Sequence, residues 1–184
     1  MSLQETILGR VQIFFSHFAP HVAVTSKTKL GHPGLDFDTV TIQSDIRRDL
    51  AGTRIGFSDT LTRDIPLTQF GEGSTAGDIV TFLVDPQNTK FPTLEAYEAK
   101  MHERIRLELR DLVADLAVPP IDPQVLQPGA PLSTFLPNQH QQETLRIQIN
   151  DNLDKYIFRR VPPNDLLGTL NEIEDRIVVR TIIK

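Results

Sequence analysis

Residues 91 to 120, FPTLEAYEAKMHERIRLELRDLVADLAVPP, form the strongest periodic pattern in this 184-residue chain. Apolar side chains recur every three or four residues, which is the spacing of one helix face, and charged side chains of both signs occupy the opposite face. Thr93 is a suitable N-cap, and Pro119-Pro120 cannot continue a helix. The sequence therefore predicts a helix of about six or seven turns. Its buried face would consist of Leu94, Tyr97, Met101, Ile105, Leu109, Leu112, Val113 and Leu116.

A second amphipathic pattern covers residues 3 to 18, LQETILGRVQIFFSHF. Its apolar side chains are again three or four residues apart, and Pro20 follows, whose ring is incompatible with a helix interior. The sequence predicts an N-terminal helix that ends near Phe18.

Between His21 and Val84 the apolar spacing shortens, and Gly, Pro and Asp separate short runs, which indicates strands. The runs are HVAVT, LDFDTVTIQ, TRIGFS and DIVTFLV. The last is apolar on both faces and is the predicted central strand.

Near the end of the chain, TLRIQIN and KYIFRR, joined by DNLD, predict a hairpin. A short helix in PPNDLLGTLNEIED and a final strand, RIVVRTIIK, follow. The stretches DLAGT at 49 and DLLGT at 165 are similar, but their surroundings do not match, so no repeat is predicted. The predicted class is α+β: one domain over residues 1–184, with a mixed or antiparallel sheet packed against the N-terminal helix and the long helix.

Residues 118–144 hold six of the thirteen prolines and show no periodicity. Such a stretch is either a flexible linker or an extended arm. Its apolar side chains argue against a purely solvated linker, and we expect them to pack on a neighbouring subunit. The predicted interaction residues are Val125, Leu126, Leu132, Phe135 and Leu136.

Composition narrows the class of protein. Cysteine is absent, which excludes disulfides, thiolate metal sites and cysteine nucleophiles. The formal net charge is −5, and the doubled arginines at 47–48 and 159–160 are isolated, so nucleic acid is not expected as the main partner. No apolar run approaches the ~20 residues of a membrane helix, and the N-terminus lacks the pattern of a signal peptide. We expect a protein of the cytoplasm or of a soluble assembly, without a cofactor, a bound metal or membrane insertion.

His32, Asp36 and Asp38 are the candidate catalytic residues. The two aspartates are two apart in a predicted strand and would share one face, with His32 in the preceding turn. Two carboxylates and an imidazole can bind a divalent cation, or act as a general base and its partner. Alternatively, the aspartates face water while Leu35 and Phe37 point inward.

The stretch FGEGSTAGD, residues 70 to 78, is rich in glycine. Phosphate-binding loops need a strand before them and a helix after them, whereas here a strand is predicted to follow. We therefore interpret the stretch as a mobile polar loop, and an interaction loop that closes over a partner stays open as an alternative.

These observations favour a non-enzymatic structural or assembly subunit that packs against copies of itself or other subunits through the arm. The order of a terminal helix, a sheet with a Gly-rich loop, one long helix and a closing strand resembles the small ring-forming subunits of phage tails and contractile injection machines. The resemblance is architectural, without a shared residue motif, and implies a ring-forming component. Two alternatives stay open: a small metal-assisted hydrolase using Asp36, Asp38 and His32, and a regulatory module that binds a small ligand under the Gly-rich loop.

Overall fold

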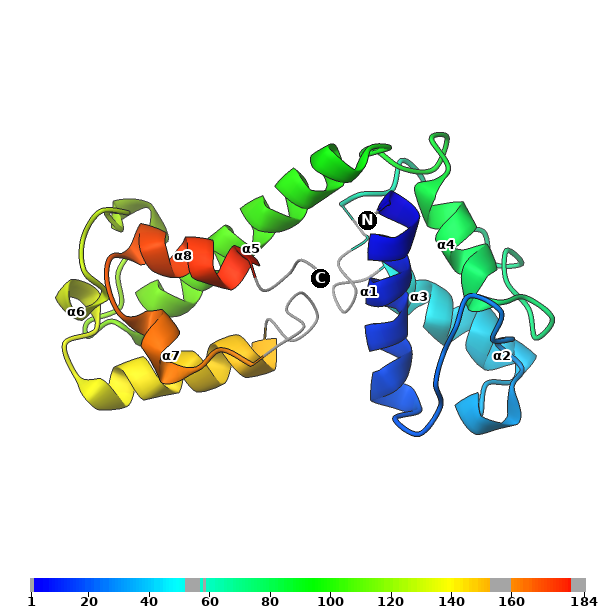
Figure 1. The fold of residues 1–184 in the computed structure, drawn as a ribbon, viewed down its shortest axis with the longest axis horizontal. Coiled ribbons are helices and arrows are strands. Elements are labelled where there is room, and N and C mark those ends of the chain that lie inside the picture. Colours follow the sequence, from blue (N-terminus) through cyan, green and yellow to red (C-terminus); the bar gives the residue numbers. More distant parts are fainter. Residues whose placement is uncertain (1, 52–56, 58, 153–159, 180–184) are drawn as a thin grey trace. The chain divides into compact units, whose positions relative to one another are not determined.

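The computed structural model describes residues 2–51, 57, 59–152 and 160–179. The chain forms two compact units, Met1–Glu98 and Ala99–Lys184, which we call unit 1 and unit 2. Both units are built mainly from helices (Figure 1). The predicted α+β class is wrong: the described residues contain no sheet, and their β pairing consists of three isolated bridges.

Unit 1 begins with α1 (Leu3–Phe18), which confirms the predicted N-terminal helix. Ser2 and Glu5 form a capping box at its start, and it ends before Pro20. The 3₁₀ turn η1 (Pro33–Leu35) leads into a second helix in three sections, with a π-helical turn in the middle. The sections are α2 (Thr39–Thr41), η2 (Ile42–Ile46) and α3 (Arg47–Ala51). Next comes α4 (Ala76–Val84), which packs against α1.

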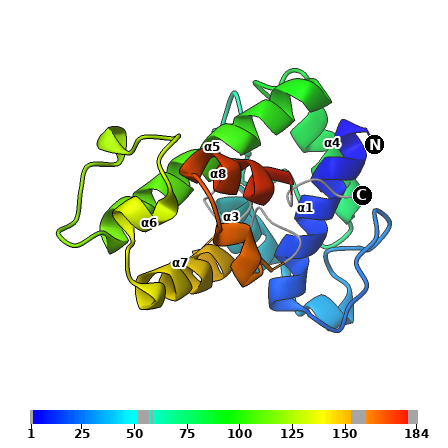
Figure 2. The ribbon, with the colours of Figure 1, turned by 60° about the vertical axis from the view of Figure 1, so that its left-hand side comes forward.

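The long helix α5 (Leu94–Leu116) confirms the prediction made for residues 93 to 116, and most of it belongs to unit 2. At its start the Thr93 hydroxyl accepts a hydrogen bond from the Ala96 N–H at 3.2 Å. Two further helices and three short helical turns complete unit 2. They are η3 (Pro123–Val125), α6 (Leu132–Phe135), α7 (Gln139–Asn152), η4 (Pro163–Leu166) and α8 (Leu170–Val179). Figure 2 shows α8 alongside α5, as in Figure 1.

The two units have the same order of elements: a first helix, a loop, a second helix and a last helix. In each unit the loop before the second helix forms an antiparallel bridge with the residue that precedes the last helix. Lys29 pairs with Thr75 in unit 1, and Pro131 pairs with Thr169 in unit 2. Both threonines are engaged in a capping box with the acidic residue three positions later.

The hydrogen bonds beside these bridges also correspond. Leu30 N–H donates to the Ser74 carbonyl at 2.8 Å, and Leu132 N–H donates to the Gly168 carbonyl at 3.0 Å. Both leucines are buried. The chain is therefore a tandem of two units with a common topology. The similar stretches DLAGT and DLLGT do not mark this repeat, because the first starts inside α3 and the second inside η4.

Buried side chains occupy matching positions in the two units. The first helices bury residues at a spacing of four: Ile7, Val11 and Phe15 in α1, and Ile105, Leu109 and Val113 in α5. Five residues after the capping threonine, both last helices bury a side chain, but the residue types differ. Val80 holds this position in α4, and Glu174 holds it in α8.

The stretch DIVTFLV lies in α4, although it was predicted as the central strand. The stretch is rich in β-branched residues and apolar on both faces, so it fits a buried strand and a buried helix equally well. The Thr75 and Asp78 side chains decide between them, because each bonds the backbone N–H of the other and so begins a helix. A threonine followed three residues later by a carboxylate was the signal available in the sequence.

The stretch TLRIQIN lies in α7, although it was predicted as a hairpin strand. Its alternation matches the period of a strand, but Leu145 and Ile149 are also four residues apart, and both are completely buried. Ile147, which a strand would have buried with them, is 48% exposed. The helical period therefore decides this segment.

The stretch LDFDTVTIQ is also not a strand. Asp36 has a left-handed φ of 52° at the end of η1, and Asp38 caps α2, so the chain turns twice where an extended segment was predicted. HVAVT forms a turn and an irregular loop. The predicted helix over 162–175 falls on η4, the first part of α8 and the loop between them. The predicted final strand RIVVRTIIK is wrong for its first four residues, which lie in α8. TRIGFS apart from Phe57, KYIFRR apart from Arg160, the second half of the DNLD connection and the last five residues lie outside the described residues. The first half of DNLD ends α7.

Candidate functional site

A pocket of about 330 Å³ opens in unit 1 between the end of α1, the η1 turn and the helix from α2 to α3. Phe14, Leu35 and Ile46, which are almost completely buried, form its base. Phe18 also lines it and is 41% exposed, so we call it the Phe18 pocket. The remaining lining residues are Phe37, Thr41, Asp36, Asp45 and Asp49.

Local sequence positions the aromatic side chains of this pocket. Phe14 and Phe18 are four apart in α1 and share one face, with ring centroids 4.9 Å apart. Phe37 lies between the left-handed residue Asp36 and the cap Asp38, and these two turns direct the chain back toward α1. Its ring centroid is 5.7 Å from that of Phe18 and 5.9 Å from that of Phe15.

Carboxylates form the rim of the Phe18 pocket. Asp45 and Asp49 are one helical turn apart, and Arg48 lies 3.5 Å from the first carboxylate and 3.4 Å from the second. Asp36 is exposed, and no hydrogen bond or ion pair with a described residue engages its side chain. Among the described residues that line the pocket none is basic, so the rim carries negative charge.

The predicted cluster of His32, Asp36 and Asp38 is separated by its local bonding. His32 Nδ1 accepts a hydrogen bond from the Gly34 N–H at 3.0 Å, and Asp38 Oδ1 accepts one from the Thr41 N–H at 2.7 Å. The Thr41 hydrogen bond also lowers the pKa of Asp38. Of the three predicted residues, Asp36 alone lines the pocket. Within the described ranges, no three His, Asp or Glu side chains lie together as metal ligands would.

The Gly-rich loop of residues 70 to 78 is followed by α4 and not by the predicted strand. A helix N-terminus attracts a phosphate through its free N–H groups. Here the Gly77 N–H donates to the Ser26 carbonyl at 2.8 Å, and the Asp78 N–H donates to the Thr75 hydroxyl at 3.2 Å. Asp78 adds a negative charge at the same place. These contacts do not favour a phosphate site.

The Pro-rich segment 118–144 folds onto unit 2. Leu126, Leu132 and Leu136 are buried there, and Phe135 is half-buried. Val125 is 61% exposed and is thus the predicted interaction residue most accessible to a partner. The three leucines would have to leave the core of their own unit to reach a neighbouring subunit.

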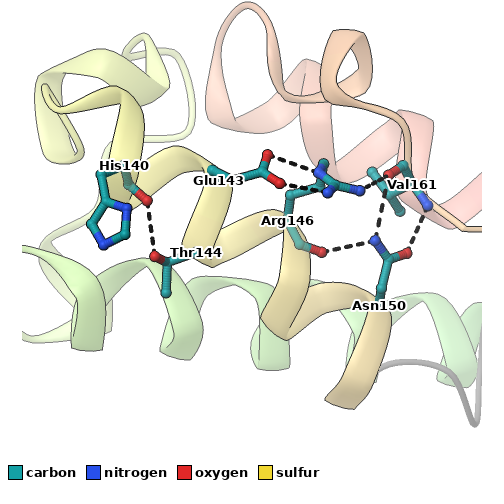
Figure 3. Close-up of polar contacts among 6 residues, drawn as sticks. All are labelled: His140, Glu143, Thr144, Arg146, Asn150 and Val161. Atoms are coloured by element: carbon teal, nitrogen blue, oxygen red, sulfur yellow. Dashed lines mark hydrogen bonds and ion pairs between the residues drawn. The ribbon is translucent and has the colours of Figure 1, made fainter.

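A polar network joins α7 to the chain at Val161 (Figure 3). Arg146 makes two hydrogen bonds to Glu143, at 2.5 and 2.9 Å, which lower the pKa of Glu143. Asn150 accepts a hydrogen bond from the Val161 N–H at 2.7 Å and donates to the Arg146 carbonyl at 2.9 Å. These groups satisfy one another and hold the chain at Val161 against α7, so the network has a structural role.

The end of α5 in unit 2 has contacts of its own. Leu116 ends α5 as Phe18 ends α1, and the Gln141 side chain of α7 donates a hydrogen bond to the Leu116 carbonyl at 2.8 Å. Leu136 is completely buried next to the start of α7.

A second depression of about 290 Å³ lies in unit 2 beside α5 and η3. Leu107, Arg110 and Asp122 are among its lining residues. Arg110 is bonded to Glu174, and Asp122 caps η3 by accepting a hydrogen bond from the Gln124 N–H at 2.9 Å. Because its charged groups are engaged within unit 2, this depression is a weaker candidate than the Phe18 pocket.

Comparison with protein-family models, with curated proteins and with solved structures finds no match to this chain. Across the described ranges, no helix combines the length and the apolar character needed to span a membrane.

Proposed function

We propose that the protein is a non-enzymatic interaction subunit that works by protein–protein packing, with the Phe18 pocket as the surface that receives another subunit. The observation that carries the proposal is the exposure of Phe18. This phenylalanine is 41% exposed, yet it lies beside the buried base of an open apolar pocket. A partner side chain placed there would cover the ring and gain its burial free energy.

The place of the interaction differs from the one expected from the sequence. The arm was expected to be the contact, but Leu126, Leu132 and Leu136 contribute to the core of unit 2. Moving them to a neighbour would cost the burial that they already have. The Phe18 pocket needs no such rearrangement.

We do not propose a ring-forming role like that of the subunits of phage tails and injection machines. The resemblance to them rested on a sheet and a closing strand, and the described residues contain no sheet. The chemistry of the Phe18 pocket, and not that architecture, supports the interaction role.

The proposal is tested by selecting random displayed peptides on the full-length protein and measuring their affinity for two variants. Phe18→Asp places a charge in the pocket at an exposed helix end. Val40→Asp makes the same change at a side chain that is 71% exposed and outside the pocket. We expect selected peptides to lose binding to Phe18→Asp and to keep binding to Val40→Asp, with the fold of both variants checked by circular dichroism. The proposal is wrong if no selected peptide depends on Phe18.

A further inference from the structure

We infer that the occupant of the Phe18 pocket is a segment of a partner protein in which an apolar side chain stands next to basic ones. The inference rests on the proposed function and adds the chemistry of the partner. The volume of about 330 Å³ lies at the small end of ligand pockets, which span roughly 300–1,000 Å³. A pocket of that size suits one or two side chains of a partner protein, and we call the apolar one the anchor.

The base of the pocket selects the apolar part of the segment. Phe14, Leu35 and Ile46 are at most 3% exposed and present no polar side-chain atom. A polar group pushed against them would lose its hydrogen bonds to water without replacement. The anchor is therefore aliphatic or aromatic.

The rim selects the charge beside the anchor. Asp36 and Asp45 are exposed carboxylates, and Asp36 has no bonded partner among the described residues. A basic side chain placed at the rim would pair with them, whereas an acidic one would be repelled. The exposed ring of Phe18 is an additional favourable surface for a guanidinium or an ammonium group.

The overall charge favours a different protein as the partner. A second copy of this chain carries the same net charge of −5 and is repelled at long range. Anionic lipid surfaces and nucleic acids are disfavoured at the acidic rim for the same reason. The occupant is thus a basic and apolar segment of another polypeptide.

Arg48 of this chain competes with the basic side chains of that segment for the rim carboxylates. The Arg48 side chain is 70% exposed, and its guanidinium lies within 3.5 Å of both rim carboxylates on the helix, Asp45 and Asp49. A basic side chain of the partner must share these carboxylates with it. Removing the positive charge at position 48 should therefore strengthen binding, which is a change that a merely structural role would not produce.

The test uses three synthetic peptides that differ at two positions: Gly-Ser-Arg-Leu-Arg-Ser-Gly, and the same peptide with the neutral Gln or the acidic Glu in place of both arginines. Each is titrated into the full chain and followed by ¹H–¹⁵N NMR, at low and at high salt. We expect the arginine peptide to bind about tenfold more tightly than the glutamate peptide at low salt, and the difference to shrink at high salt. Shifted signals should cluster at Phe18, Phe37 and Thr41.

Three variants assign the effect to the rim. Asp36→Asn combined with Asp45→Asn should reduce the preference for the arginine peptide about threefold or more. Asparagine tolerates the left-handed backbone at position 36, so the fold is preserved. Arg48→Gln should raise the affinity of the arginine peptide about twofold. Asp64→Asn, at an exposed residue outside the pocket, is the matched control and should change nothing.

The outcomes separate the two proposals. If the three peptides bind the pocket equally, or if peptides selected through Phe18 contain no excess of basic residues, the charge inference is wrong and the interaction site stands. If the arginine peptide instead shifts signals away from the pocket, the inference is also wrong. If neither the synthetic nor the selected peptides depend on Phe18, the proposed function itself fails.

Discussion

Arg110 donates two hydrogen bonds to the carboxylate of Glu174, at 2.6 and 3.0 Å, and this carboxylate is completely buried. The Arg110 side chain is 30% exposed, and the Arg106 guanidinium lies 3.9 Å from the same carboxylate. The hydrogen bonds with Glu174 raise the pKa of Arg110. A charged pair thus joins α5 to α8, whereas unit 1 has Val80 at the position that corresponds to Glu174.

Replacing Arg110 by methionine should destabilise the protein by about 2–3 kcal/mol. The buried Glu174 carboxylate would lose both strong hydrogen bonds, and the partial exposure of Arg110 puts the cost at or below the lower end of the ~3–5 kcal/mol range for breaking a buried pair. Urea unfolding measures the change. The double variant with Glu174→Val, which copies the residue of unit 1, should recover most of the loss.

Arg106→Met is the control for this prediction. Its guanidinium is 40% exposed and pairs mainly with Asp175, itself 59% exposed, at 2.7 Å. Such a surface pair contributes about 1 kcal/mol or less. If Arg110→Met costs no more than Arg106→Met, the buried pair does not stabilise unit 2 as argued.

Thr75→Ala and Thr169→Ala test the tandem organisation. Each removes the N-cap of the last helix in one unit and should cost about 1 kcal/mol. Hydrogen exchange should report faster opening of α4 in the first variant and of α8 in the second, with the other unit unaffected. If either variant reduced the exchange protection of both units equally, the two units would not unfold as separate cooperative units.

Gly168→Ala should destabilise unit 2 by at least ~1 kcal/mol. Gly168 has a φ of +106°, and an added Cβ would collide with the Glu172 carboxylate that closes the capping box. Gly129→Ala is the matched control, because nothing lies within 4 Å of an added Cβ there. Thermal unfolding compares the two. A lower melting temperature for Gly168→Ala alone is the expected result.

Stability should fall as the pH drops below the ordinary carboxyl range near 4.5. The backbone hydrogen bond from Thr169 lowers the pKa of Glu172, and the bond from Ser2 does the same for Glu5. A lowered pKa means that the folded state prefers the ionised carboxylate, so this stabilisation is complete above the unfolded value and disappears in acid. The melting temperature of Glu172→Gln should depend less steeply on pH below that range than that of the wild type. Asp111→Asn, at an exposed helix position, should follow the wild type.

Local signals in the sequence identified two helices correctly. Both α1 and α5 have long patterns with the helical period, and both are flanked by a cap and by proline, so their bounds follow from neighbouring residues alone. The capping boxes at Thr75 and Thr169 carried the same information for α4 and α8. In α4 the capping box was outweighed by a β-branched stretch whose length fits either structure. In α8 the start of the helix was predicted, but the prediction ended at Asp175 because RIVVRTIIK was predicted as a strand.

The candidate site could be predicted in part. Asp36 was singled out, but as one of three ligands on a strand, whereas the structure puts it at the rim of an apolar pocket. His32 was predicted in the turn before that strand and Asp38 on the strand, and both prove to be caps of short helical turns. Phe18, Phe37 and Asp45 come together only because the chain reverses at Asp36, and no spacing in the sequence encodes that reversal.

The sequence by itself determined the two longest amphipathic helices and the negative charge, because these depend on residue type and on neighbours a few positions away. Tertiary structure alone decided that TLRIQIN is helical, that Leu126, Leu132 and Leu136 are buried in their own unit, and that three phenylalanines meet three aspartates. The physical reason is that short apolar stretches satisfy the strand and the helix period alike. Burial against residues distant in the chain, such as Glu174 against Arg110, selects between the two.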